Sequence, residues 1–199
     1  MRPSLERVLA EPATRAAPAL LGALVRHGEV VVRITEVEAY EGPEDPASHA
    51  FGGPTPRTAI MFGPPGRLYV YFSYGMHWCA NVVCGPDRTA SAVLLRAGEV
   101  VEGRALARER RGRRTPDRRL ATGPACLTQA LGIDVAAAGS DLLGDGPARL
   151  LPAAPDPTTV VSGPRIGVSR AADRPWRFWL DADPTVSAYR RSPRAVDGW

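Results

Sequence analysis

Two glutamates and a tyrosine alternate along one stretch rich in β-branched residues, and they are the first side chains that could do chemistry. The run VVVRITEVEAY at residues 30–40 is typical of a strand, and its period of two puts Glu36, Glu38 and Tyr40 on one face. Charges on an apolar strand are costly to bury unless they look into a cleft, so this face predicts a polar site. An edge strand with a solvated face would give the same pattern, and the run alone leaves both open.

A histidine with acidic neighbours raises the question of a metal ion. Glu44, Asp45 and His49 belong to a loop at residues 41–67 that is rich in Gly and Pro, and such long loops are usually functional or disordered. No HExxH motif or paired-histidine spacing accompanies them, so we expect no metal site. A lone histidine is usually structural or solvated. A metal hydrolase that joins the strand glutamates to Asp45 and His49 remains a competing hypothesis.

Tyrosines and an asparagine follow on a predicted hairpin. The run LYVYFS at residues 68–73 predicts a strand with Tyr71 on the face opposite the core, where tyrosines are often simple boundary residues. MHWCANVVC at 76–84 predicts the next strand, and Tyr74-Gly75 favours a tight turn between them. Because Tyr74 at a hairpin tip cannot bury itself in its own core, we expect it to be exposed or inserted into a partner. Asn81 is disfavoured inside a strand and needs a hydrogen-bond partner there.

The elements that must position these residues are mostly short strands. We expect a helix from Thr14 to about Leu24, a strand at 91–97, a helix at 123–133 and late strands at 164–169 and 176–180. This order predicts an α+β fold with a curved, mostly antiparallel β-sheet, a protruding β-hairpin and peripheral helices. The length of 199 residues and the absence of a linker predict one compact domain over residues 1–199.

The basic charge is all arginine and is concentrated in one place. The chain has 25 basic residues and no lysine, which excludes a lysine Schiff base and a P-loop lysine. Residues 104–119 hold eight arginines and two acids, a net +6, so the overall +4 leaves −2 on the remainder. Guanidinium groups pair with phosphates and release counterions, which suits an anionic polymer. A solvated loop or helix face is the alternative.

Composition also bears on location. No apolar run approaches the ~18–20 residues of a membrane span, and the charged start MRPSLERVLAEP lacks the apolar core of a signal peptide. Cys79, Cys84 and Cys126 form no CxxC pair, which is typical of small buried residues in a reducing cytosol. We therefore expect no membrane partner and a cytoplasmic location.

Long ordered motifs relate the chain to a known family. The run ITEVEAYEGPEDPASHAFGG, followed by TPRTAIMFGPPGRLYVYFSYGMHWCANVV, resembles the alkyladenine (3-methyladenine) DNA glycosylase family of the eukaryotic type. Further matches are AVLLRAGEVVEG, GPACLTQALGID and PRIGVS, so the resemblance spans roughly residues 8–180. It implies a compact domain with a curved antiparallel sheet and without a helix-hairpin-helix.

The resemblance implies roles in catalysis and DNA binding. Glu38, in EAY, would be the base that activates water, and Arg96, in LLRA, would help to hold that water. Tyr74, before Gly-Met, would wedge into the minor groove and fill the gap left by a flipped base. Arg57 and Arg165 are weaker candidates for contacts with DNA.

The resemblance also implies a pocket for the damaged base. Tyr40, His49 and Tyr71 would form aromatic walls, which favour an electron-poor alkylated purine by ~0.5–2 kcal/mol. Asn81 would act as a selectivity filter at the pocket floor, where it would clash with the amino group of normal guanine.

Together these features predict a monofunctional glycosylase that removes alkylated or deaminated purines from double-stranded DNA and leaves an abasic site. We expect no cofactor, a monomer, and a location at the bacterial nucleoid in the cytoplasm. Without a lysine amine, strand cleavage through a Schiff base has no side chain to use. The alternative is a non-catalytic module that binds damaged DNA, in which Glu38 would be dispensable.

Overall fold

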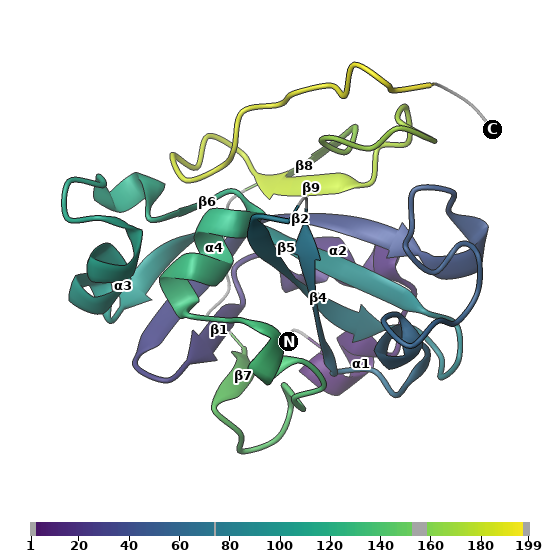
Figure 1. Cartoon of the computed structure of the whole chain (residues 1–199), viewed down its shortest axis with the longest axis horizontal. Helices are drawn as coiled ribbons and strands as arrows, with labels where there is room; N and C mark the ends of the chain where they lie inside the picture. Colours follow the sequence, from purple (N-terminus) through teal and green to yellow (C-terminus); the bar gives the residue numbers. More distant parts are fainter. Residues whose placement is uncertain (1–2, 74, 153–158, 197–199) are drawn as a thin grey trace.

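An antiparallel sheet runs through the residues that the computed structural model describes, 3–73, 75–152 and 159–196 (Figure 1). Within these residues nine strands belong to it: β1 (Leu24–His27), β2 (Val30–Glu41), β3 (Leu68–Ser73), β4 (His77–Cys84), β5 (Ser91–Glu102), β6 (Ala121–Thr122), β7 (Ala148–Leu151), β8 (Val160–Gly163) and β9 (Arg177–Leu180). Six follow one another in the order β3-β4-β5-β2-β1-β7, while β6 pairs with β5 and β9 pairs with both β2 and β8. The predicted α+β fold with a mostly antiparallel sheet is confirmed.

The two longest strands, β2 and β5, pair at the centre of this sheet. The Val, Ile and Thr content of β2 favours a strand, because β-branched side chains pack well on a pleated surface. The pairing shifts register between Ile34 and Glu36 and again between Glu36 and Val37. Such bulges bend and twist a strand and re-aim its side chains. The stretch with the strand glutamates is therefore also the place where β2 departs from a regular ladder.

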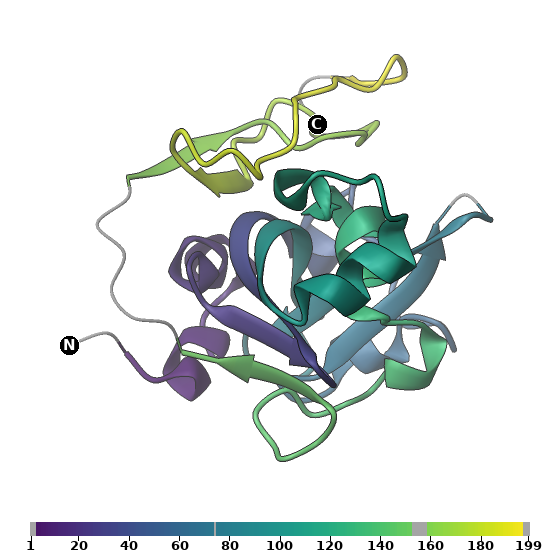
Figure 2. The ribbon, with the colours of Figure 1, turned by 90° about the vertical axis from the view of Figure 1, so that its left-hand side faces the viewer.

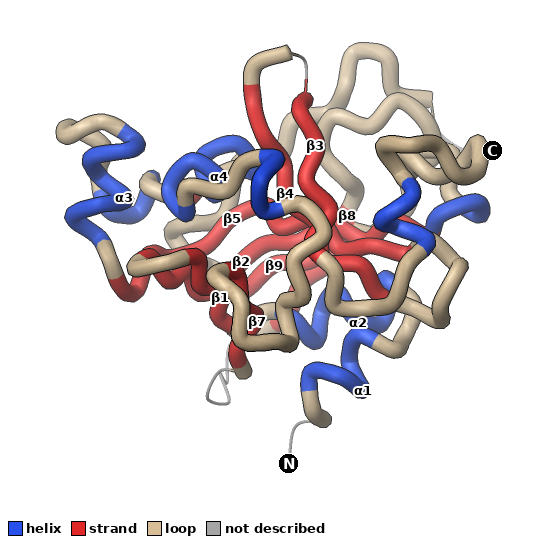
Figure 3. Tube along the Cα trace, turned by 60° about the horizontal axis from the view of Figure 1, so that its bottom comes forward, coloured by secondary structure: helices blue, strands red, loops and turns tan. Residues whose placement is uncertain are grey.

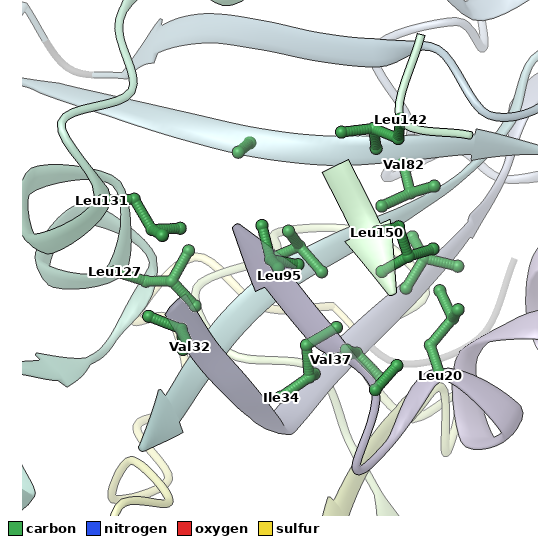
Figure 4. Close-up of a cluster of buried hydrophobic side chains, with 14 of the residues drawn as sticks. Leu20, Val32, Ile34, Val37, Val82, Leu95, Leu127, Leu131, Leu142 and Leu150 are labelled. Carbon is green, nitrogen blue, oxygen red and sulfur yellow. The ribbon is translucent and has the colours of Figure 1, made fainter. Parts of the chain in front are cut away.

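The two faces of the sheet have different roles. Figure 4 shows the main core, in which Ile34, Val37, Val82 and Leu95 from three strands pack together with leucines of the neighbouring helices. Burial of one such side chain stabilises the fold by about 1.5–3 kcal/mol. The alternate positions of the same strands face the other side and carry the polar candidates. One-sided burial thus fixes the direction in which those candidates point.

Short helices cover the sheet at its periphery. The helices are α1 (Leu5–Leu9), α2 (Ala13–Leu20), α3 (Arg104–Arg111) and α4 (Pro124–Leu131), with 3₁₀ turns η1 (Gly42–Glu44), η2 (Ala59–Phe62), η3 (Asp117–Arg119) and η4 (Val135–Ala137). α2 packs on β2 and β5, α4 packs on β4 and β5, and α3 packs on α4. Among the described residues, no helix is long and apolar enough to cross a membrane.

The N-terminal helix ends earlier than predicted. It stops at Leu20, and Leu24 begins strand β1 instead of ending the helix. Gly22 has a φ of +81°, a left-handed conformation that breaks the helix and turns the chain into the sheet. The Ala and Leu stripe that indicated the helix continues past its end because the following strand is also buried.

Two strand predictions near glycine are also corrected. β5 extends to Glu102 rather than 97, because Gly98 lies so close to Val32 and Arg33 that a Cβ there would clash with them. Glycine here permits a close approach of two strands. Residues 164–169 form a loop, not a strand, and follow the end of β8 at Gly163. Pro164 cannot donate to a ladder, and the loop turns Arg165 into the interior.

β3 and β4 form the predicted hairpin, which in Figure 2 projects to the right beyond the neighbouring helices. The strands stay paired from Leu68↔Val82 to Ser73↔His77. Phe72 and Met76, with 48% and 66% of their surface exposed, make the end of the hairpin apolar. Tyr74 lies outside the described residues.

The C-terminal part of the chain forms a layer over the glutamate stretch of β2. In Figure 2 this layer lies above the rest of the molecule. β9 pairs with β2 in the register Glu36↔Trp179 and Glu38↔Arg177, and β8 pairs with β9 on its other edge. The segment after β9 continues across the same region, where Ser187 contacts Glu36. This layer removes the two glutamates of β2 from solvent.

Candidate active site

The predicted site residues converge on one cavity of about 680 Å³, on the face of the sheet opposite the main core. That volume lies within the ~300–1,000 Å³ typical of small-molecule sites. Its walls come from β2, β3, β4 and β5, from residues 46–49, and from the loop at residues 166–169. The residues predicted for catalysis and for the base pocket all line it: Glu38, Tyr40, His49, Tyr71, Asn81 and Arg96.

Glu38 is fully buried, and its carboxylate is held from three sides. Oε1 accepts the backbone N–H of Ile166 at 2.7 Å and lies 3.2 Å from Nη1 of Arg96. Oε2 accepts the hydroxyl of Tyr40 at 2.9 Å. A carboxylate offers about four acceptor positions, so the described residues fill three of them and leave one on Oε2.

Glu36 has more hydrogen-bond donors around its carboxylate than Glu38 has. Its Oε1 accepts Nε of Arg96 at 3.0 Å, Nη1 of Arg177 at 3.2 Å and the hydroxyl of Ser187 at 2.9 Å. Its Oε2 accepts the backbone N–H of Ser187 at 2.7 Å. Four donors thus bind this carboxylate, one more than bind Glu38, and residues of the C-terminal layer supply three of them. Glu36 therefore fixes Arg96, whose guanidinium reaches both glutamates of β2.

The groups beside Glu38 keep their protons. Burial opposes the charge on Arg96, but the nearby Glu38 and Glu36 carboxylates outweigh it and raise its pKa above the ordinary arginine value. Burial, and then the charge of Glu38, raise the pKa of Tyr40 well above 10. Arg96 is therefore a permanent cation and Tyr40 a permanent hydrogen-bond donor to the carboxylate.

An aromatic wall closes another side of the cavity. The His49 ring meets Tyr71 edge to face at a centroid distance of 4.5 Å, and Tyr71 stacks on Tyr69 at 5.6 Å. Nδ1 of His49 lies 3.3 Å from the Tyr69 hydroxyl. Tyr69 is nearly fully buried and so anchors the two rings that line the cavity beside it.

His49 is an uncharged member of this wall. Partial burial, followed by the nearby charge of Arg57, lowers the pKa of His49 below 6.5, although the residue remains exposed at its outer side. Arg57 itself is exposed and lines the same cavity. Its role as a DNA contact stays a prediction.

Arg165 lies in the interior and not on a DNA-facing surface, which differs from its predicted role. Only 1% of its surface is exposed. Nη1 donates to Asp45 at 2.5 Å and to the carbonyl of Ala39 at 3.0 Å, and Nη2 donates to Asp45 at 2.9 Å. The guanidinium lies 4.7 Å from the centre of the Tyr40 ring. Arg165 thus supports the Tyr40 wall from behind, because both of its Nη atoms donate to groups inside the fold.

Asn81 has the hydrogen-bond partner that its place in a strand required. It lies opposite Tyr69 in the β3–β4 register, and its Nδ2 donates to the backbone carbonyl of Tyr69 at 3.2 Å. The contact commits the amide nitrogen and orients the side chain, which also lines the cavity. The oxygen end of the amide is then the end free to face a ligand.

Three contributors to the site were absent from the predicted set. Tyr69 orients His49, the N–H of Ile166 binds Glu38, and Arg177 binds Glu36. Tyr69 shares a strand face with Tyr71, so the period of two was the signal that could have identified it. A backbone N–H has no residue-type signal. Arg177 lies far along the chain from Glu36, and nothing local in the sequence marks their contact.

The carboxylates that a metal hydrolase would use as ligands form ion pairs with arginines instead. Asp45 is bound by Arg165, and Glu36 is bound by Arg96 and Arg177. Within the described ranges, no group of three or more His, Cys, Asp or Glu side chains is placed to hold a metal ion.

Comparisons with known proteins find relatives along most of the chain. A family model described as methylpurine-DNA glycosylase (MPG) matches residues 7–184. A protein of Nocardia farcinica is 56% identical over 199 residues, which cover 96% of this chain and 93% of that protein. Proteins of Leifsonia xyli (57% identity, 89% and 88% coverage) and Frankia casuarinae (54% identity, 92% and 92%) are similar throughout.

All three relatives have names that include the words 3-methyladenine DNA glycosylase. The family model alone covers most of the chain, and it includes every strand that lines the cavity. The resemblance seen in the sequence motifs is therefore confirmed. The chain belongs to the methylpurine-DNA glycosylase family and is, with that family, a hydrolase of DNA base-excision repair.

Proposed function

We propose that this chain is a monofunctional glycosylase that hydrolyses the bond between an alkylated purine and its sugar in double-stranded DNA. The observation that carries the proposal is the one unused acceptor position on Glu38, in a cavity whose other walls are aromatic. A buried carboxylate held by three donors is positioned for one more hydrogen bond. A water molecule that bridges Glu38 and the sugar would supply it.

The hydrolysis then needs only Glu38, a water molecule and the positioning residue Arg96. Glu38 takes a proton from the water while the water oxygen bonds to C1′ of the sugar. The C1′–N bond breaks, and the purine leaves with the electron pair, which neutralises the charge of an alkylated base. The same carboxylate stabilises the positive charge that develops on the sugar. Arg96, fixed by Glu36, holds Glu38 in place and balances its charge.

The aromatic walls favour a cationic base. Alkylation at N3 or N7 makes a purine positively charged, and π faces attract such a ring by ~0.5–2 kcal/mol more than a normal one. Tyr40 and Tyr71, together with a neutral His49, offer such surfaces. A protonated His49 would repel the same ligand, so its lowered pKa supports this selectivity.

Two further filters add to that preference. A damaged base pairs poorly, so rotating it out of the duplex costs less than for a normal base. Asn81, with its nitrogen bound to Tyr69, would present its oxygen to the purine edge and select against the bulk of a guanine amino group. Deaminated purines such as hypoxanthine are neutral and also need an acid. We propose that the protonated form of His49, a minority because its pKa is lowered, supplies that proton to a neutral base.

The protruding hairpin is suited to opening the duplex. Its paired strands extend to Ser73 and His77, and Phe72 and Met76 expose apolar surface beside the tip. In our proposal Tyr74, outside the described residues, wedges between base pairs and fills the gap left by the flipped base. We further propose that the protein acts as a monomeric single domain on chromosomal DNA in the cytoplasm.

Excision from a synthetic duplex tests the proposal. An oligonucleotide with one N3-alkyl adenine or one hypoxanthine is incubated with enzyme, and alkali then reveals abasic sites. We expect strand breaks only after alkali, and loss of product in Glu38→Gln. Glu44→Gln, an exposed neighbour in η1, is the matched control and should be as active as the wild type.

The outcomes separate the alternatives. Equal product from wild type and Glu38→Gln would overturn the mechanism, and lesion binding without any product would favour a damage-binding module. Strand breaks without alkali would refute the monofunctional assignment. For the hairpin, Tyr74→Ala should impair excision from a duplex more than excision of an unpaired base. Equal losses on both substrates would exclude the wedge.

A further inference from the structure

The arginine-rich segment at residues 104–119 consists of two groups of side chains. Four of its eight arginines have partners within the fold. Arg104 binds the carbonyl of Val100 and pairs with Asp117, Arg108 pairs with Asp117, Arg110 binds the carbonyl of Ala130, and Arg111 binds the carbonyl of Leu120 and the side chain of Gln129. These contacts fasten α3 to α4 and to the loop that follows. This half of the segment therefore serves the fold.

The other four arginines, called here the arginine cluster, are Arg113, Arg114, Arg118 and Arg119. All four are exposed, and their guanidinium groups make no hydrogen bond or ion pair with any residue in the described ranges. They line an open cavity of about 570 Å³, whose other lining residues are Gly112, Thr115 and Pro116. The cluster thus presents four uncompensated positive charges to one cavity.

Hydrogen bonds hold the backbone of the arginine cluster in this form. Thr115 donates its hydroxyl to the carbonyl of Arg111 at 3.1 Å and its N–H to the carbonyl of Gly112 at 2.9 Å. The N–H of Arg119 donates to the carbonyl of Pro116 at 2.8 Å. Asp117, the single acid in the loop, pairs with arginines of α3 and neutralises none of the cluster. Like charges held this close repel one another, and a bound anion would relieve that repulsion.

The arginine cluster lies on the same side of the molecule as the hairpin. α3 packs on α4, α4 packs on β4, and in Figure 3 these helices and the hairpin lie in the upper part of the view. Arg119 precedes Pro124, which lines the active-site cavity, by five residues. Five residues span at most ~18 Å, and a duplex rises ~3.4 Å per base pair. Arg119 is therefore within about five base pairs of a base held in the site, and the other three arginines line the same cavity as Arg119.

We propose that the arginine cluster is a second DNA-binding site, which takes backbone phosphates of the duplex a few base pairs from the lesion. The inference rests on the proposed function, because it needs DNA in the active site to set the distance. Guanidinium forks match phosphate oxygens in pairs. The cavity offers no aromatic or large aliphatic side chain, and stable protein interfaces depend on such anchors. A phosphate backbone, in contrast, can bind through its charge to exposed guanidinium groups without such anchors.

Salt-dependent binding to an undamaged duplex tests the proposal. Each phosphate contact contributes ~0.9 to the slope of log affinity against log salt. We expect R113Q/R114Q and R118Q/R119Q each to lower that slope by about 1.8. Between about 50 and 200 mM salt the affinity of each variant would then change about 12-fold less than that of the wild type.

A matched variant controls for net charge. R7Q/R15Q also removes two exposed arginines, but from α1 and α2, which lie at the bottom of Figure 3, away from α3 and the hairpin. Its slope should equal that of the wild type. Equal slope losses in the test and control variants would reduce the effect to net charge and overturn the proposal. Full slopes in both test variants would also overturn it and would point to an acidic protein as the partner.

The excision assay keeps this inference separate from the proposed function. At saturating enzyme, both test variants should excise a lesion at the wild-type rate, because the arginine cluster is not in the active-site cavity. A wild type that fails to excise would refute the proposed function, while the binding slopes would still decide the DNA contact. A wild type that excises while both test variants keep full slopes refutes the second site alone.

Discussion

Removing the carboxylate of Asp45 should destabilise the fold by a predictable amount. Asp45 and Arg165 have fully buried side chains and are joined by two contacts of 2.5 and 2.9 Å. Asp45→Asn would leave the guanidinium in the interior without its counter-charge. Breaking a buried pair from one side costs about 3–5 kcal/mol. In a chain of this length 1 kcal/mol shifts Tm by about 2–4 °C, so Tm should fall by about 6–20 °C.

A double variant at Asp45 and Arg165 separates the effect of the ion pair on stability from its effect on excision. Asp45→Leu combined with Arg165→Met replaces both charges with apolar side chains, an exchange that is often neutral or stabilising. The double variant should therefore recover most of the lost Tm. Its excision activity should stay impaired, because the Tyr40 ring then lacks the guanidinium 4.7 Å behind it and the carbonyl of Ala39 lacks its donor.

Thermal unfolding and single-turnover excision are the assays. The exposed pair Arg149–Asp145 supplies the control, since Asp145→Asn should cost no more than about 1 kcal/mol. Equal shifts in Tm for Asp45→Asn and Asp145→Asn would refute the reasoning. So would an Arg165→Met variant with an unchanged Tm and a reduced salt dependence of DNA binding, which would restore the direct DNA contact predicted from the sequence.

Three other perturbations test the site directly. Arg96→Lys keeps the charge but cannot reach both Glu36 and Glu38, so kcat should fall more than KM rises in steady-state assays. Tyr69→Phe removes the hydroxyl 3.3 Å from His49, a loss of about 0.5–1.5 kcal/mol that should raise KM by up to about tenfold. Because burial and a neighbouring arginine lower the pKa of His49, the imidazole stays neutral as the pH falls through 6.5. KM for a cationic lesion should therefore rise only below that pH, and His49→Gln should abolish the rise.

Local periodicity predicted the strands that carry the site. β3 has the predicted bounds, and β2 extends the predicted run by one residue. Both strands bury one face in the main core, so alternation in the sequence directly reports the direction of each side chain. The errors occurred where a glycine or proline changed the path of the chain. Gly98 indicated an end of β5 where it permits a close strand contact, and the loop at 164–169 was mistaken for a strand.

Long-range pairs within the site had no such local signal. Asp45 and Arg165 are 120 residues apart, and Glu36 and Arg177 are 141 residues apart. The alternation on β2 placed Glu36 and Glu38 on one face but could not show that Glu36 is bound by the C-terminal layer while Glu38 lines the cavity. That difference depends on Ser187, which reaches Glu36 from the C-terminal layer. Sequence patterns thus predict the direction in which each side chain points. Its partners come from segments far away in the chain, and only the fold shows which they are.

The chain uses arginine in place of lysine for different reasons in the interior and on the surface. Arg96 binds one glutamate through Nε and the other through Nη1, and Arg165 meets both oxygens of Asp45. Each contact pattern needs a planar fork, which an ammonium group does not have. At these buried positions arginine is thus required by geometry. At the exposed positions Arg7 and Arg15 a lysine ammonium would carry the same single charge. Arginine at these two positions therefore reflects the overall composition of the chain and not a required geometry.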